Sequence, residues 1–197
     1  MMLDYLEKID ADLLLLINGA HNSFIDQLMW VVSGKIVWIP FGLLLIFMTY
    51  RRAGVKTTLF LILGTVLCFL LADQLSVHLF KETFQRYRPS HNLILSDQLH
   101  YHVYENGELY KSGMYGFISS HASNFFAFSM FMFLYLKSKF KRIRWVLFVI
   151  CFLVAYSRVY LGVHYPSDVI AGGFFGSVIG VVVFAFIRKL SQLYLSK

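Results

Sequence analysis

Three basic residues in this sequence have the types and spacing expected of ligands for a phosphoryl group. Lys81 and Arg88 are seven residues apart, so on a continuous helix they lie on one face, two turns apart. Arg158 belongs to a later segment and must approach from elsewhere in the fold. Arginine presents a planar fork that matches two phosphate oxygens, and lysine adds a point charge. Three such cations predict a site that stabilises a five-coordinate phosphorus transition state, each by about 3 kcal/mol.

Two histidines and one aspartate supply the other groups that phosphoryl transfer needs. One imidazole, of His121 or His164, can attack phosphorus and form a phosphohistidine, and the other can donate a proton to the leaving oxygen. Asp168 follows His164 by four residues. If Pro166 begins a helix, Asp168 lies in its first turn and can reach back to the imidazole. The pattern therefore predicts a histidine oriented by a carboxylate.

Two serines directly before His121 are predicted to complete the phosphate site. Ser119 and Ser120 stand where a long apolar run begins. Backbone amides at a helix N-terminus bind anions, because the first turn leaves them without intrahelical partners. We therefore expect these serines and the amides around them to hold phosphate oxygens.

The elements that must position these residues are predicted to cross a membrane. Hydrophobic residues make up 58% of the chain and charged residues only 15%, against roughly a quarter in soluble domains. We expect spanning helices over 57–80, 119–136, 145–160 and 167–187. Upstream, Gly34, Lys35 and Pro40 interrupt an apolar region, which predicts a short first membrane helix over 24–33 and a second over 37–50. The chain is therefore expected to be all-α, an integral membrane bundle of about six transmembrane helices in a single domain over residues 1–197.

The distribution of basic residues indicates the orientation of this bundle. Threading the four clear spans places residues 51–56, 137–144 and 188–197 on one face, and these tracts hold 11 of the 18 Lys and Arg residues. Such an excess marks the cytoplasmic face of a membrane protein. It also explains the net charge of +7, so we expect no nucleic-acid partner. The same threading brings the three polar clusters described above to the opposite, outward face.

Several other residues are expected to have structural roles. Cys68 and Cys151 lie in apolar runs and are predicted to be buried free thiols. Asp73 lies inside a span, where we expect it to join a buried polar network. Residues 1–12 carry four acidic side chains, so no cleavable signal peptide is predicted there. A stripe of small residues in the last span predicts close helix packing within the monomer: Gly172, Gly176 and Gly180. The outward loop holds three irregularly spaced histidines that are not expected to bind a metal: His91, His100 and His102.

The candidate catalytic and phosphate-binding residues occur in an order and spacing that resemble three signatures of the type 2 phosphatidic acid phosphatase (PAP2) superfamily. Residues 81–89 read Lys-Glu-Thr-Phe-Gln-Arg-Tyr-Arg-Pro, which matches lysine, six residues, Arg-Pro. Residues 157–168 match Ser-Arg, five residues, His, three residues, Asp without a gap. The remaining signature usually reads Pro-Ser-Gly-His and is Ile-Ser-Ser-His at 118–121, where serine replaces a flexible glycine. The resemblance extends over residues 57–187.

The resemblance implies a role for each matching residue. His164 is then the nucleophile that forms the phosphohistidine, Asp168 orients it, and His121 is the general acid for the leaving group. The residues implied to bind the phosphate are Lys81, Arg88, Arg158, Ser119 and the amide of Ser120. The family needs no metal and no other cofactor, and no cluster of metal ligands in the sequence contradicts this.

The resemblance also implies a function and a location. It indicates a metal-independent phosphatase that acts on a bacterial envelope lipid at the periplasmic side of the inner (cytoplasmic) membrane. On overall resemblance we favour lipid A slightly over undecaprenyl diphosphate, phosphatidylglycerol phosphate and phosphatidic acid. An inert membrane scaffold or a small transporter explains the hydropathy but not three phosphate-type clusters on one face. A vanadium-dependent haloperoxidase shares the signatures, but those relatives are soluble and larger.

Overall fold

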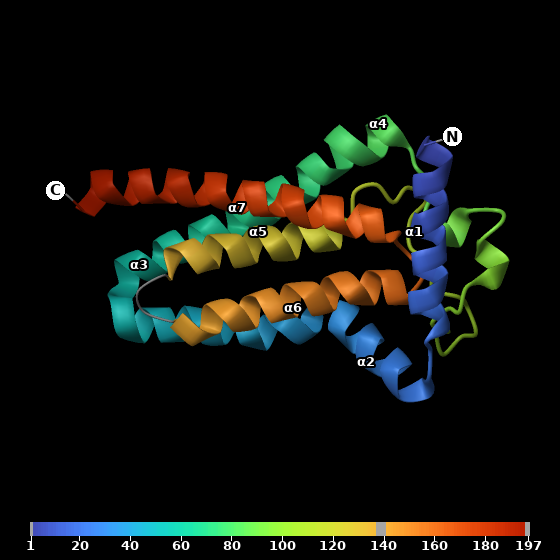
Figure 1. Ribbon diagram of the computed structural model, residues 1–197. Coiled ribbons are helices and arrows are strands. Elements are labelled where there is room, and N and C mark those ends of the chain that lie inside the picture. Colours follow the sequence, from blue (N-terminus) through green and yellow to red (C-terminus); the bar gives the residue numbers. More distant parts are fainter. Residues whose placement is uncertain (1, 137–140, 196–197) are drawn as a thin grey trace.

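The computed structural model describes residues 2–136 and 141–195 as a bundle of helices (Figure 1). These residues form no β-strand, only two isolated bridges, so the predicted all-α class is confirmed. The α-helices are α1 (Met2–Gly19), α2 (Ser23–Ser33), α3 (Ile39–Leu75), α4 (Glu82–Phe84), α5 (Ser120–Tyr135), α6 (Lys141–Tyr160) and α7 (Pro166–Leu195). The short helices of other types are η1 (Ile36–Trp38), η2 (Ser76–Lys81), η3 (Pro89–His91) and η4 (Ser96–Gln98), of which η2 is a π-helix.

Gly54 divides α3 into two arms. Its φ of 78° and ψ of 175° lie outside the helical region, and glycine adopts them without the steric cost of a Cβ. Both arms are apolar, as predicted for two spans joined near residues 51–56. With α2, the two arms of α3, α5, α6 and α7, the bundle is consistent with the prediction of about six helices.

The apolar region before Gly54 is interrupted where the sequence predicted. α2 ends at Ser33, Gly34 has extended backbone, and η1 leads into α3 with Pro40 in its first turn. Trp38 stabilises the break, because its Nε1 donates to the carbonyl of Val32 at 2.9 Å. α2 has 11 residues, about half the length needed to cross the hydrocarbon core. The predicted short first membrane helix is therefore α2, which reaches only part of the way across.

α1 lies across one end of the bundle, roughly perpendicular to the long helices (Figure 1). It contacts α6 and α7. Asn18, near its end, donates to the carbonyl oxygens of His100 and Tyr160 at 2.8 and 2.7 Å and accepts from the amide of His100 at 2.8 Å. α1 is thereby fixed both to the bundle and to the long loop over residues 85–119.

α5 packs against α7 through the predicted stripe of glycines. A Cβ added at Gly172, Gly176 or Gly180 would lie 2.6, 2.1 or 2.5 Å from a carbonyl oxygen of α5. The carbonyls belong to Ser119, Ser123 and Ala127. These distances are shorter than any ordinary contact, so the close approach of the two backbones requires glycine. The prediction that the stripe packs within the monomer is confirmed, and Cys68 and Cys151 are buried free thiols as predicted.

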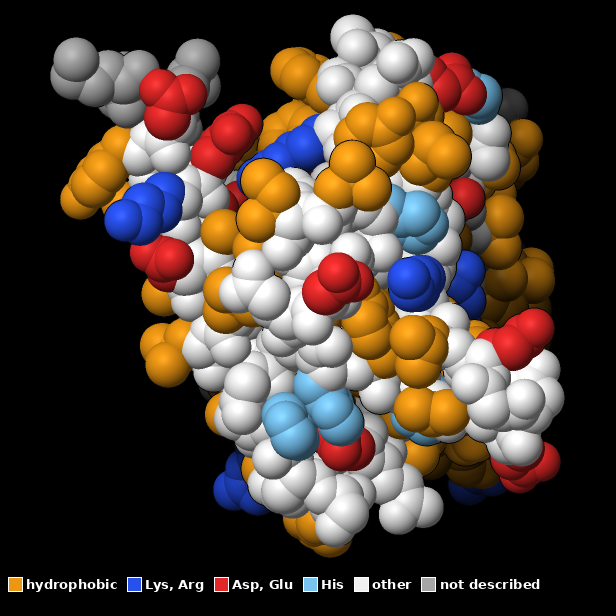
Figure 2. All heavy atoms as spheres, turned by 90° about the vertical axis from the view of Figure 1, so that its right-hand side faces the viewer, with side chains coloured by type: hydrophobic (Ala, Val, Ile, Leu, Met, Phe, Trp, Pro, Cys, Tyr) orange, Lys and Arg blue, Asp and Glu red, His pale blue; other side chains and the backbone are white. Residues whose placement is uncertain are grey.

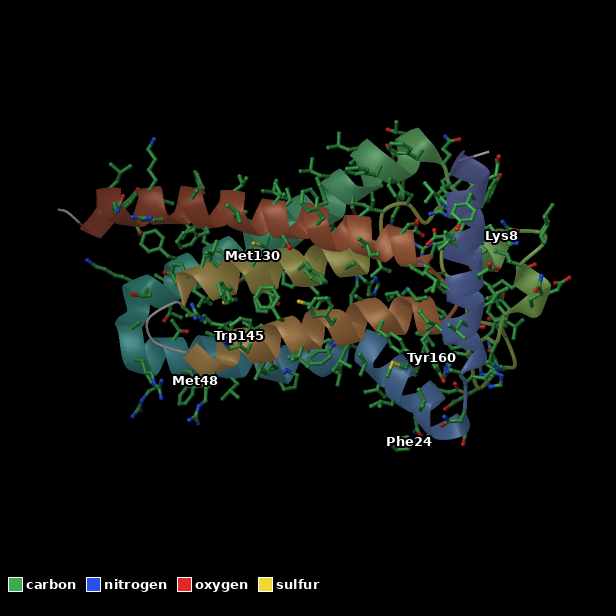
Figure 3. The ribbon with its side chains drawn as sticks, in the orientation of Figure 1. Lys8, Phe24, Met48, Met130, Trp145 and Tyr160 are labelled. Atoms are coloured by element: carbon green, nitrogen blue, oxygen red, sulfur yellow. The ribbon has the colours of Figure 1, made fainter. Side chains whose placement is uncertain are left out.

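The outer surface of the bundle is largely apolar. In Figure 3 the side chains around Met130 and Trp145 are mostly carbon, whereas nitrogen and oxygen atoms gather near α1, at the end marked by Lys8 and Tyr160. Exposed large side chains on the helices include Phe47, Val149, Phe152, Phe174 and Phe186. An apolar surface of this extent is suited to hydrocarbon and not to water. The chain is a multi-pass membrane protein.

The two ends of the bundle differ in the kinds of charged side chain that they carry. The turn at Gly54 and the end of α7 lie at one end, with the predicted basic tracts at 51–56 and 188–195 (Figure 1). Residues 137–140 and 196–197 of the predicted tracts lie outside the described residues. α1, the loop over 85–119 and the beginnings of α5 and α7 lie at the other end. Figure 2 shows that end face on, with acidic, basic and histidine side chains among apolar ones.

We expect Gly176→Ala to lower the free energy of unfolding by about 1–3 kcal/mol, the range for overpacked cores. The added methyl group would meet the carbonyl of Ser123, so α5 and α7 would have to move apart. Thermal unfolding of the purified protein in detergent measures the change as a lower Tm. Gly42→Ala is the matched control, because a Cβ at Gly42 meets nothing within 4 Å. Equal Tm values for the two variants would contradict the close packing.

Candidate active site

Lys81 and Arg88 do not share one helical face, so this prediction is wrong. The helix that follows Lys81 ends at Phe84, because Gln85 takes a left-handed conformation with φ of 46°. Arg88 has extended backbone, with φ of −65° and ψ of 156°. The π-helix η2, which ends at Lys81, also departs from the periodicity that the prediction assumed. The two cations therefore approach the site through a bend in the chain and not through helical spacing.

Lys81 binds the serine that replaces the usual glycine of the second signature. Its Nζ donates to Ser120 Oγ at 2.7 Å. Ser76 Oγ lies 2.7 Å from the same hydroxyl and also donates to the carbonyl of Asp73 at 2.8 Å. The Asp73 carboxylate accepts from Asn124 Nδ2 at 3.2 Å, in agreement with its predicted place in a polar network. Ser120 therefore contributes a hydroxyl group that orients the lysine.

Arg88 is buried and has its guanidinium against His164. Its NH1 lies 2.9 Å from Nε2 of His164 and 3.2 Å from the carbonyl oxygen of Val163, and its Nε donates to the carbonyl of Tyr115 at 3.1 Å. Burial, and secondarily the charge of Arg158, lower the pKa of Arg88 to about 10. The group is still charged at neutral pH. It therefore brings a fixed positive charge directly to the imidazole.

His164 and Asp168 form the predicted pair. Pro166 is the first residue of α7, so Asp168 lies in its first turn and its Oδ2 is 3.3 Å from Nδ1 of His164. The amide of Tyr165 donates to the same oxygen at 3.1 Å. A carboxylate at Nδ1 assigns the proton to that nitrogen and leaves the lone pair of Nε2 facing Arg88. Burial, then the charges of Arg88, Arg158 and Lys81, lower the pKa of His164 well below its usual value, so the imidazole is neutral at pH 7.

Ser119 joins the beginnings of α5 and α7. Its side chain accepts from the amide of Ala122 at 3.4 Å, as the N-cap of α5, and its own amide donates to the backbone carbonyl of Asp168 at 3.0 Å. Both polar groups of Ser119 thus have protein partners. The residue aligns the start of α5 with the turn that holds His164 and Asp168.

Arg158 comes from the end of α6 and is almost completely buried. Its NH1 donates to Ser33 Oγ and its NH2 donates to the hydroxyl of Tyr110 at 3.0 Å. Its buried Nε has no partner among the described residues. Buried N–H groups are nearly always paired, so this donor is available to an anion. The neighbouring Ser157 instead donates to a carbonyl of its own helix at 2.7 Å.

His121 lies where two cavities meet. The larger cavity, of about 620 Å³, is mostly apolar and lies between α3, α5 and α6, with Phe69 and Phe128 in its wall. The smaller, of about 410 Å³, has apolar side chains in its wall together with the polar groups of Lys35, Tyr110 and Arg158. His121 lines both and is half-buried. Its imidazole can therefore act between an apolar group in one cavity and an anion near the other.

The sequence did not identify several residues that support this site. Arg86 falls between the two cations of the first signature and bonds to Asp168, and Asp10 of α1 bonds to Arg86. Ser33 and Tyr110 hold Arg158 from α2 and the outward loop. None of these residues has a local pattern that distinguishes it. Only their positions in the folded chain reveal them.

Two histidines of the outward loop, His100 and His102, stack on other aromatic rings. His100 stacks on His21, with ring centroids 3.8 Å apart and an interplanar angle of 7°, and its Nε2 lies 3.0 Å from Asp26. His21, His100 and Asp26 have atoms that could bind a metal ion. The parallel imidazoles do not converge on one point, however, and Asp26 also accepts from the Tyr160 hydroxyl at 2.6 Å. His102 stacks on Trp30.

The sequence is similar to a known protein family and to known bacterial proteins. A family model described as the PAP2 superfamily matches residues 58–192, which include all three signatures. The chain is 32% identical over 182 residues to a lipid A 4'-phosphatase of Porphyromonas gingivalis, covering 92% of this chain and 74% of the relative. It is 32% identical over 190 residues to a lipid A 4'-phosphatase of Bacteroides thetaiotaomicron, covering 96% and 82%.

A solved structure has the same fold. It is a transmembrane PAP2 type phosphatidylglycerolphosphate phosphatase from Bacillus subtilis, which aligns with a TM-score of 0.66 at 20% sequence identity. The alignment covers 94% of this chain and 87% of the other. At this identity the likeness establishes the arrangement of helices.

We expect Gly116→Ala to weaken the binding of orthovanadate, a phosphate-like oxyanion, by about tenfold, which corresponds to about 1.4 kcal/mol. A Cβ at Gly116 would lie 3.0 Å from Asp168 Oδ2 and 3.1 Å from Arg88 Cγ, so it would press on groups on both sides of His164. Titration calorimetry in detergent measures the affinity. Gly113→Ala in the same loop is the control, because a Cβ there meets nothing within 4 Å. Unchanged affinity in Gly116→Ala would show that this geometry does not bind the oxyanion.

Proposed function

Since the chain belongs to the PAP2 superfamily and is a membrane phosphatase that hydrolyses lipid phosphate esters, we propose that its substrate is lipid A. The relatives named lipid A 4'-phosphatase match nearly the whole chain, which supports removal of the 4'-phosphate. The observation that carries the proposal is the position of the His164 imidazole between Asp168 at Nδ1 and Arg88 at Nε2. A nucleophile, its orienting carboxylate and a phosphate-binding cation are thus in contact.

We propose that His164 begins the reaction by attacking phosphorus. NH1 of Arg88 exchanges Nε2 for a phosphate oxygen, and the freed Nε2 lone pair forms an N–P bond while the bond from phosphorus to the sugar oxygen breaks. Lys81, Arg88 and Arg158 hold the three remaining phosphate oxygens, with the Ser120 hydroxyl and nearby amides. As Nε2 becomes bonded, the imidazole gains positive charge, which the Asp168 carboxylate stabilises.

His121 completes both half-reactions in this proposal. The bound phosphate stabilises the protonated imidazole, which gives its proton to the sugar oxygen that leaves. As a neutral base it then takes a proton from the water that attacks the phosphohistidine, which restores the protonated form. That water breaks the N–P bond, releases inorganic phosphate and restores His164. The place of His121 between the two cavities supports this role, because the leaving group lies on the lipid side and the phosphate on the cationic side.

The larger cavity supports a lipid substrate that stays partly in the bilayer. Its wall includes Phe41, Phe69, Phe128 and Leu147, and it has the volume of a ligand pocket. An acyl chain can occupy this space while the phosphate reaches the cations. We propose that residues 1–197 act as one domain and that the site faces the periplasm from the inner membrane. The basic tracts at the opposite end of the bundle support that orientation.

We expect the purified protein to release phosphate from lipid A faster than from undecaprenyl diphosphate, phosphatidylglycerol phosphate or phosphatidic acid. The assay is phosphate release from each lipid in mixed micelles, without added metal and with EDTA. His164→Ala should abolish release from every lipid while leaving the Tm close to that of the wild type. Phosphate release that persists in His164→Ala would show that His164 is not the nucleophile. A clear preference for another lipid would replace lipid A as the substrate.

Arg88→Lys is expected to lower kcat/KM by roughly 10²-fold, the loss typical of one donor to a transition-state oxyanion. Lysine keeps the charge but cannot bind His164, a carbonyl and a phosphate oxygen with one planar group. Lys111→Ala is the control, since Lys111 is an exposed cation on the same loop that lies over the ring of Tyr101. Steady-state kinetics on the best lipid measures both. Similar losses in the two variants would mean that the planar fork of Arg88 is not in use.

A further inference from the structure

We propose that Arg86 and Asp10 are positioning residues, through which the surface helix α1 holds the Asp168 carboxylate in line with His164. One guanidinium bridges the two carboxylates. Its NH1 donates to Asp168 Oδ1 at 2.9 Å and its NH2 donates to Asp10 Oδ2 at 2.7 Å. The inference rests on the proposed function of His164 and Asp168. It adds a connection between that pair and an element outside the three signatures.

The two oxygens of Asp168 have different partners, and this gives Arg86 its effect. Oδ2 accepts from the amide of Tyr165 and faces Nδ1 of His164, whereas Oδ1 accepts from Arg86. Donors at both oxygens, one N–H of Arg86 at Oδ1 and the amide of Tyr165 at Oδ2, leave the carboxylate little freedom to rotate. Arg86 therefore determines where Oδ2 points. The imidazole in turn depends on Oδ2 for its tautomer and orientation.

Asp10 fixes the backbone on which Asp168 stands. Its Oδ1 accepts from the amide of Ser167 at 2.8 Å, and its Oδ2 accepts from the hydroxyl of Ser167. Arg86 also donates to that hydroxyl at 2.7 Å. Asp10 thus binds an N–H group at the beginning of α7 that has no partner inside the helix. α1 contacts α7 at this point, at the end of the bundle where the helices cross in Figure 1.

Arg86 partly neutralises the two carboxylates that it bridges. The Asp168 side chain is 0% exposed and that of Asp10 is 9% exposed, so neither is well solvated. Burial alone would lower the pKa of Arg86, but the neighbouring Asp168 and Asp10 carboxylates raise it. The ring of Tyr165 covers the guanidinium carbon at 4.0 Å from its centroid. Without the cation, two poorly solvated carboxylates would face each other.

Neither Arg86 nor Asp10 lines the two cavities that meet at His121. The pair therefore acts on the reaction through Asp168 and not through contact with the lipid or its phosphate. Substitutions of Arg86 or Asp10 should therefore change the kinetics differently from a substitution of Arg88. A loss in the rate of the chemical step is expected, with little change in substrate binding.

The test compares Arg86→Lys, Asp10→Asn and the double variant with the wild type. The control is Asp12→Asn, which removes the same charge from an exposed position of the same helix. Each is assayed with lipid A and with short-chain phosphatidic acid, so that failure of lipid A as a substrate leaves the test intact. kcat, KM and Tm are measured for each variant. Single-turnover trapping of the phosphohistidine reports the first half-reaction directly.

We expect both single variants to lower kcat and the trapping rate by roughly tenfold to hundredfold, as misplaced reacting groups do. KM should stay within about twofold, and Asp12→Asn should match the wild type. The double variant should fall little further than the poorer single variant, since both break one bridge. Wild-type kcat in both single variants would overturn the proposal. So would a rise in KM at constant kcat, or a loss of activity that simply follows a loss of folded protein in the Tm and trapping measurements.

Discussion

A carboxylate buried in the first turn of α7 sets the requirements for the rest of the structure. Asp168 has no exposed surface, so its charge needs partners in place of water. The partners come from the turn before α7, through His164 and the amide of Tyr165, and from the outward loop, through Arg86. The loop therefore folds back onto the end of the bundle, where Arg86 reaches Asp168. The position of α1 across that end follows from the same need.

The positions of these partners depend on close packing between the helices. Glycines on α7 let its backbone approach the carbonyls of α5 more closely than any side chain would permit. This approach brings the amide of Ser119 to the backbone carbonyl of Asp168. The next residue, Ser120, accepts a hydrogen bond from Lys81, the last residue of the π-helix η2. The alignment of polar groups at the end of the bundle therefore depends on how closely the helices pack in its apolar middle.

Much of this could be predicted from the sequence, and the rest could not for definite physical reasons. Hydropathy located the spans, and the spacing from His164 to Asp168 predicted their contact because Asp168 lies in the first turn of a helix that begins just after His164. The same reasoning failed for Lys81 and Arg88, since Gln85 takes a left-handed conformation without the glycine that usually signals one. The bridge from Arg86 to Asp10 joins residues 76 apart in the chain. No periodicity links such positions, and only the folded bundle brings them together.

The position of His121 between two cavities has a consequence for what happens after catalysis. In the proposed reaction the dephosphorylated lipid leaves through the apolar cavity and can diffuse sideways into the leaflet. Inorganic phosphate in that reaction leaves from the side of Arg158 and dissolves in the aqueous phase. The products thus depart in different media and do not obstruct each other. Turnover then responds separately to the lipid composition of the membrane and to the phosphate concentration of the surrounding solution.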